Sequence, residues 1–125
     1  MNRFLVAIAL LAAVPGSAWA HGTAEASHGG RMAEAGGYRL ELTATDQGVD
    51  LYVTDHDNRP VALDQAGGRV TLLTGGDKVK IALAPTAGNR LSHAGPVAGA
   101  NAAAAVIVVE GLPQPVSARL PAVGP

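Results

Sequence analysis

Histidines are the residues of this chain best suited to chemistry, and two of the four lie close together near the N terminus. His21 follows the triplet Ala18-Trp19-Ala20, and His28 stands seven residues later in a tract rich in glycine and alanine. A histidine that begins a processed chain offers two nitrogens, the free α-amine and imidazole Nδ1, which can close a chelate ring on one metal ion. Because Cu(II) prefers nitrogen and oxygen ligands in a tetragonal arrangement, the pattern predicts a copper site, with zinc or nickel as alternatives.

Further ligands would have to come from the rest of the chain. His28 would add a third nitrogen, although the alternative of an incidental polar residue stays open. Met32 carries a thioether that would suit Cu(I), but a lone methionine also serves as a packing residue. His93 is expected on a loop at a strand end, either as a distant ligand or as an ordinary exposed histidine.

His56 lies in the stretch "TDHDNRP". The carboxylates of Asp55 and Asp57 would raise its basicity and could orient its ring. The alternative is a turn, in which Asp55, Asp57 and Asn58 accept hydrogen bonds from nearby backbone N–H groups. Both interpretations can hold together.

Other chemistries lack the residues that they require. The chain has no cysteine, which removes blue-copper centres and structural zinc sites of the cysteine type. Ser92 and His93 are adjacent, so on a strand their side chains would point apart rather than form a nucleophile–base pair. No glycine-rich loop leads into a helix to cradle a phosphate. We therefore predict a protein without enzymatic activity.

The first twenty residues predict a secretory signal peptide. Arg3 precedes an apolar run over residues 4–14, and Ala18-Trp19-Ala20 supplies the small residues of a cleavage site. Cleavage after Ala20 would make His21 the first residue of a periplasmic chain with no membrane span, because the run is shorter than the about 20 residues that a span needs. A retained anchor is the alternative. Loss of Arg3 would take the formal net charge from −1 to −2, which does not favour a nucleic-acid partner.

The remainder divides into an arm, residues 21–36, and a domain, residues 37–122. The arm has almost no large apolar residue and is expected to be flexible. In the domain, apolar and polar residues alternate between turn residues, as in half-buried strands. Strands are expected at residues 38–45, 49–54, 70–74, 79–83, 102–110 and 116–120, with shorter pieces at 61–63 and 90–93. About seven short strands predict an immunoglobulin-like antiparallel β-sandwich, although a helix beginning at Asn101 competes with the strand at 102–110.

Several stretches of the domain, among them "VDLYVTDHDNRPV" and "VIVVEGLPQPVSARL", resemble small periplasmic β-sandwich proteins of bacteria with CopC-like or YtkA-like architecture. Such proteins are often encoded beside copper or heavy-metal efflux systems. The resemblance spans residues 28–120. In CopC-like proteins the mature terminal histidine and a later Asp-x-His pair hold Cu(II). His21 matches the terminal position, but no Asp-x-His pair occurs here, so the resemblance implies a metal-binding role for His21 alone.

Together these patterns predict a periplasmic metal-binding protein that buffers copper or delivers it to an efflux or homeostasis system. His21 would bind the metal with His28, and with His93 or His56 as further candidates. The alternative is an accessory β-sandwich module that binds another cell-envelope protein and no metal, for example by strand addition at an exposed edge.

Overall fold

The structure is a computed structural model that describes residues 26–124. The predicted signal peptide, His21 and the first part of the predicted arm lie outside the described residues. The part of the chain that is described contains no helix, and therefore none long and apolar enough to cross a membrane. The competing helix at Asn101 does not form: residues 98–102 make turns, and the strand begins at Ala104.

Eight antiparallel strands build one sheet. They are β1 (Arg31–Ala35), β2 (Tyr38–Thr45), β3 (Gly48–Asp55), β4 (Gly67–Thr74), β5 (Asp77–Pro85), β6 (Arg90–Ala94), β7 (Ala104–Glu110) and β8 (Val116–Leu120). Their order across the sheet is β1-β2-β3-β6-β5-β4-β7-β8. The predicted all-β, antiparallel class is thus confirmed, with eight strands rather than about seven.

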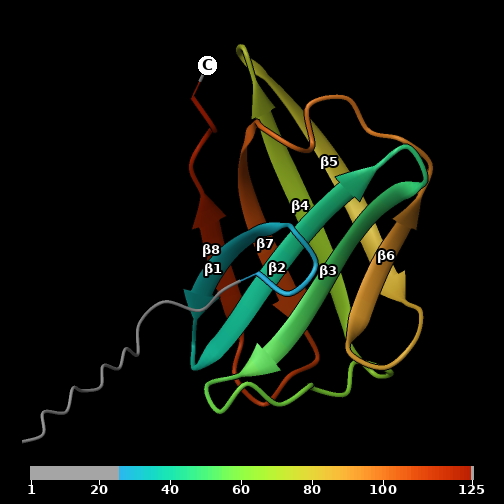
Figure 1. Cartoon of the computed structure of the whole chain (residues 1–125), viewed down its shortest axis with the longest axis vertical. Helices are drawn as coiled ribbons and strands as arrows, with labels where there is room; N and C mark the ends of the chain where they lie inside the picture. Colours follow the sequence, from blue (N-terminus) through green and yellow to red (C-terminus); the bar gives the residue numbers. More distant parts are fainter. Residues whose placement is uncertain (1–25, 125) are drawn as a thin grey trace, which may run out of the picture.

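The sheet curves back on itself and is nearly closed. Strands β1, β2, β3 and β6 form a front half that lies across a rear half of β5, β4, β7 and β8, and β1 comes to lie against β8 (Figure 1). Arg31 ties this junction together, because its Nη1 donates to the carbonyl oxygen of Pro121 at 3.1 Å and its Nη2 donates to that of Ala100 at 3.0 Å. The two edges of the sheet therefore cover one another.

The hydrophobic core fills the space between the two halves. Alternate residues of the strands point inward, as the period-two pattern predicted for β2, β3, β5 and β8. Leu40, Leu42, Leu51, Val53 and Leu91 are buried on the front half, and they face Val70, Leu72, Ile81, Leu83, Ile107, Val109, Val116 and Leu120 on the rear half. Among the described residues no aromatic side chain is fully buried in this core, so aliphatic burial holds the two halves together.

Two expectations about strands need correction. Residues 31–35 belong to the predicted flexible arm but form β1, because main-chain pairing with β2 and inward packing of Ala33 and Ala35 need no large side chain. Residues 61–63 do not form the predicted strand, and only an isolated bridge between Thr54 and Pro60 occurs. The N–H of Val61 donates to the carbonyl oxygen of Val53, but the N–H of Val53 donates to Asn89 instead of to this segment, so the ladder does not continue. Leu63 is nevertheless fully buried.

Candidate functional site

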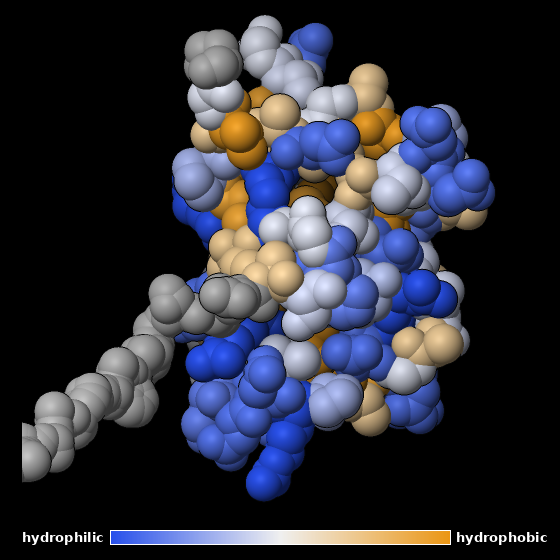
Figure 2. All heavy atoms as spheres, in the orientation of Figure 1, coloured by the Kyte–Doolittle hydropathy of each residue, from blue (hydrophilic) through white to orange (hydrophobic). Residues whose placement is uncertain are grey.

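The candidate site lies on the outer face of the front half, where the register aligns four polar or polarisable side chains. Met32 on β1 is paired with Glu41 on β2, Glu41 with Tyr52 on β3, and Tyr52 with Arg90 on β6. Directly opposite residues of antiparallel strands point to the same face. The four side chains therefore form one transverse row on a face that is largely hydrophilic (Figure 2).

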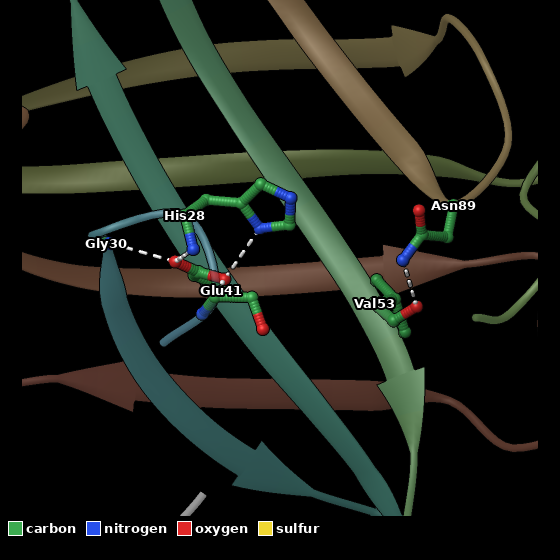
Figure 3. A network of polar contacts seen from close by, with 6 residues as sticks. His28, Gly30, Glu41, Val53 and Asn89 are labelled. Carbon is green, nitrogen blue, oxygen red and sulfur yellow. Dashed lines mark hydrogen bonds and ion pairs between the residues drawn. The ribbon is translucent and has the colours of Figure 1, made fainter. Parts of the chain in front are cut away.

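Glu41 is the centre of this row and the only buried charged residue among those described, with 5% of its surface exposed. It is covered by residues 27–30, which cross over β2 before β1 begins (Figure 3). Oε1 accepts hydrogen bonds from the backbone N–H of Ser27 at 3.1 Å and from Nδ1 of His28 at 2.9 Å. Oε2 accepts from the N–H groups of His28 and Gly30, each at 2.8 Å. Each carboxylate oxygen thus receives two donors.

These donors keep the Glu41 carboxylate ionised. Burial alone would raise its pKa, but the hydrogen bond from the His28 side chain and those from the backbone of Gly30 and His28 outweigh burial. The pKa of Glu41 consequently lies below its ordinary value. A carboxylate that accepts four hydrogen bonds stays ionised and carries a negative charge at neutral pH.

Gly30 permits the close approach of the covering segment. A Cβ at this position would clash with the carbonyl oxygen of Leu42 and would lie 2.7 Å from a side-chain carbon of Thr43. The backbone can therefore pass over β2 only because residue 30 has no side chain. This glycine brings the N–H groups of the segment within reach of Glu41.

The imidazole of His28 is held on two sides. Its ring is stacked on that of Tyr52, with the centroids 3.6 Å apart and the planes 4° from parallel. In the neutral ring Nδ1 carries the proton, because its partner, the Glu41 carboxylate, can only accept a hydrogen bond. Nε2 then holds a free lone pair, and 43% of the side chain is exposed. No hydrogen bond to Nε2 occurs among residues 26–124.

This arrangement is one that metal sites use. A ligating histidine commonly donates its other ring N–H to a carboxylate, which fixes the tautomer and makes the free nitrogen more basic. His28 lines two hollows. The smaller one, about 30 Å³, also has Ser27 and Met32 in its lining and holds a water molecule or an ion. The larger one, about 380 Å³, is more open and lies beside Gly29 and Thr43.

His56 occupies the predicted turn after β3. The Asp55 carboxylate accepts hydrogen bonds from the N–H groups of Asp57 at 2.8 Å and Arg59 at 2.9 Å, and Asn58 adopts a positive φ of 67°. The His56 side chain is 77% exposed, and its Nε2 lies 3.7 Å from an Asp57 oxygen. The turn is thus confirmed, and His56 projects from it into solvent.

His93 lies within β6 and not on the predicted loop, at the other end of the front half and on its other face. It is paired with Val49, which is fully buried and points into the core side of the sheet. The row that contains Tyr52 points outward, so His93 and His28 stand on opposite faces. Along β3, the positions of Val49 and Asp55 are about 20 Å apart at the usual rise per residue, which separates His93 from His56 as well.

The structure therefore does not gather the three described histidines. Within residues 26–124, no group of three or more histidine, aspartate or glutamate side chains is arranged to hold a metal ion. His28 alone is both oriented and free at one nitrogen, whereas His21 lies outside the described residues. Sequence inspection missed Glu41 and Tyr52, because both belong to an ordinary alternating strand pattern and nothing local indicates that a distant segment covers them.

No protein-family model, curated protein or solved structure matches this chain in the comparisons with known proteins.

Proposed function

We propose that this protein is exported to the periplasm and binds Cu(II) near its N terminus, through His21 and His28. The observation that carries the proposal is the His28 imidazole, whose Nδ1 is bound to Glu41 and whose Nε2 is unpaired among the described residues. An imidazole prepared in this way loses little rotamer freedom when it binds a metal.

The ligand set follows from the predicted cleavage after Ala20. The α-amine and Nδ1 of His21 would bind one ion as a chelate, and Nε2 of His28 would supply the third nitrogen. Seven residue steps separate the two histidines. A chain of that length can span at most roughly 23 Å, so His21 stays near His28 and can bind the same ion. Three nitrogens and one water molecule make a tetragonal Cu(II) site, while Zn(II) and Ni(II) would bind the same set more weakly.

In this proposal the protein handles metal rather than catalysing a reaction. It would buffer copper in the periplasm or pass it to an efflux system or another cell-envelope protein, as in heavy-metal resistance. The nearly closed antiparallel sheet would correspond to the immunoglobulin-like sandwich of CopC-like proteins. The exposed His28 side chain supports exchange of the metal with a partner, because a ligand at the surface can be replaced by an incoming one.

Titration of copper into the exported protein, with its first residue determined by mass spectrometry, tests the proposal. We expect one Cu(II) per chain, with nitrogen hyperfine structure in its electron paramagnetic resonance spectrum. His28→Ala removes a ligand and should weaken binding by more than the about 10-fold to 100-fold that loss of an outer-shell partner causes. One glycine added before His21 should weaken it at least as much. His56→Ala and His93→Ala are the matched controls and should bind like the unchanged protein. Equal affinity in all of these variants would refute the proposed site.

A further inference from the structure

The outer face of the rear half is unlike the rest of the surface. The pairing of β5, β4, β7 and β8 places its outward side chains in three transverse rows. The rows are Ala82-Arg69-Val108-Ser117, Lys80-Thr71-Val106-Arg119 and Lys78-Leu73-Ala104. Aliphatic side chains and cations are thus mixed on one face, and none of the three rows contains a carboxylate.

This face concentrates positive charge on a protein whose formal net charge is −1. Lys78, Lys80 and Arg119 make no ion pair among residues 26–124, whereas Arg69 is paired with Glu110 at 3.2 Å. The carboxylate next to Lys78 in the sequence belongs to Asp77, the first residue of β5, which alternation places on the other side of the strand. Three unpaired cations within one sheet face create a local positive potential that the net charge does not reveal.

The face also offers apolar contact. Leu73 is 38% exposed and shares a row with Lys78. Val79 is equally exposed, but it is paired with the buried Leu72 and belongs to the core side of the sheet. Val106 and Val108 are half-buried and lie in the middle of the face. The hollows beside His28, His56 and His93 are lined by other residues. These rows offer a partner positive charge and aliphatic contact.

We propose that this face docks on the surface of a bilayer that contains anionic phospholipid. Lysines without a shaped acceptor site attract a diffuse negative surface, to which each contributes about equally. Leu73 beside them can enter the headgroup region. An acidic protein partner would be recognised better by bidentate arginines, whereas two of the three cations without an ion pair among residues 26–124 are lysines, which act as point charges. The inference is independent of the metal proposal, because His28 and Glu41 lie on the opposite side of the molecule.

Sedimentation with phospholipid vesicles tests the inference. The exported protein should bind vesicles that contain phosphatidylglycerol and should not bind vesicles of phosphatidylcholine alone. Each cation near an anionic surface changes binding about fivefold, so Lys78→Gln, Lys80→Gln and Arg119→Gln together should weaken it roughly 100-fold. Binding should also fall steeply when salt shortens the screening length.

A variant with Arg39→Gln, Arg59→Gln and Arg90→Gln is the matched control, because it changes the net charge equally on other surfaces. We expect it to keep most of the binding, and circular dichroism should show that both variants remain folded. Equal losses in the two variants would overturn the assignment to this face. Absence of binding by the unchanged protein, or binding only to an acidic protein, would overturn the choice of lipid. Binding that neither salt nor the variants alter would point to a retained leader and would also count against it.

Discussion

Replacement of Glu41 by glutamine should release the segment that covers β2. The amide nitrogen that Glu41→Gln introduces would face the N–H groups of His28 and Gly30 in one orientation, and the N–H of Ser27 with Nδ1 of His28 in the other. In the second orientation Nδ1 can accept a hydrogen bond in its other tautomer, so at least one hydrogen bond is lost and the others lose their charge assistance. A hydrogen bond to a charged group contributes about 1.5–3 kcal/mol, so the loss amounts to at least about 1.5 kcal/mol.

The measured loss is limited by local undocking. If residues 27–30 leave the sheet, water satisfies the freed N–H groups, and the cost cannot exceed the free energy of docking that segment. We therefore expect a decrease of about 1.5–3 kcal/mol in the free energy of unfolding. Denaturation in urea would measure it, and hydrogen exchange would show faster exchange at the N–H groups of His28 and Gly30.

Glu34→Gln is the matched control for this substitution. Glu34 is 56% exposed on β1, and one of its oxygens lies 3.4 Å from Nε of Arg39. A surface ion pair of this kind contributes about 0.2–1 kcal/mol, so the control should lose no more than that. A Glu41→Gln loss as small as that of the control, with unchanged exchange at Gly30, would refute the view that four donors anchor the segment to the sheet.

A pH series tests the Glu41 carboxylate, and a substitution at Gly48 tests the packing at the start of β3. Because the pKa of Glu41 is lowered in the folded protein, its stabilising contribution is complete above the unfolded-state pKa of about 4.3 and is lost as the pH falls through the lower folded value. The free energy of unfolding, measured from pH 7 downward, should therefore fall in the acid range, and it should fall less in Glu41→Gln. Gly48 has a φ of 151°, and a Cβ there would clash with the carbonyl oxygen of His93. Gly48→Ala should therefore lower the free energy of unfolding by about 1–3 kcal/mol. Gly67→Ala is the control and should change it little, because the added carbon there meets nothing within 4 Å. Equal effects of the two substitutions would contradict this explanation.

Local sequence patterns determined much of the fold. Alternating apolar residues identified β2, β3, β5 and β8 closely, since each strand buries one face and period two is then required. The β-branched run at residues 106–109 correctly favoured a strand over a helix. The pattern failed at β1, where Ala33 and Ala35 are the only apolar residues that pack inward. Side chains this small leave no clear signal in the sequence.

The candidate site, like the fold, could be predicted from the sequence only in part. Composition singled out His28, because its tract is rich in glycine and histidine. The sequence alone also determined that no cysteine could take part in any site, and it predicts the terminal chelate at His21, which residues outside the structure would form.

Only the tertiary structure decided what surrounds His28. Glu41 is 13 residues away and Tyr52 is 24, and the two meet the imidazole because β2 and β3 pair in one register and Gly30 lets the chain cross above them. The separation of His28, His56 and His93 likewise follows from long-range pairing of β3 with β6. Such pairings depend on contacts between distant residues, and no local run of sequence specifies them.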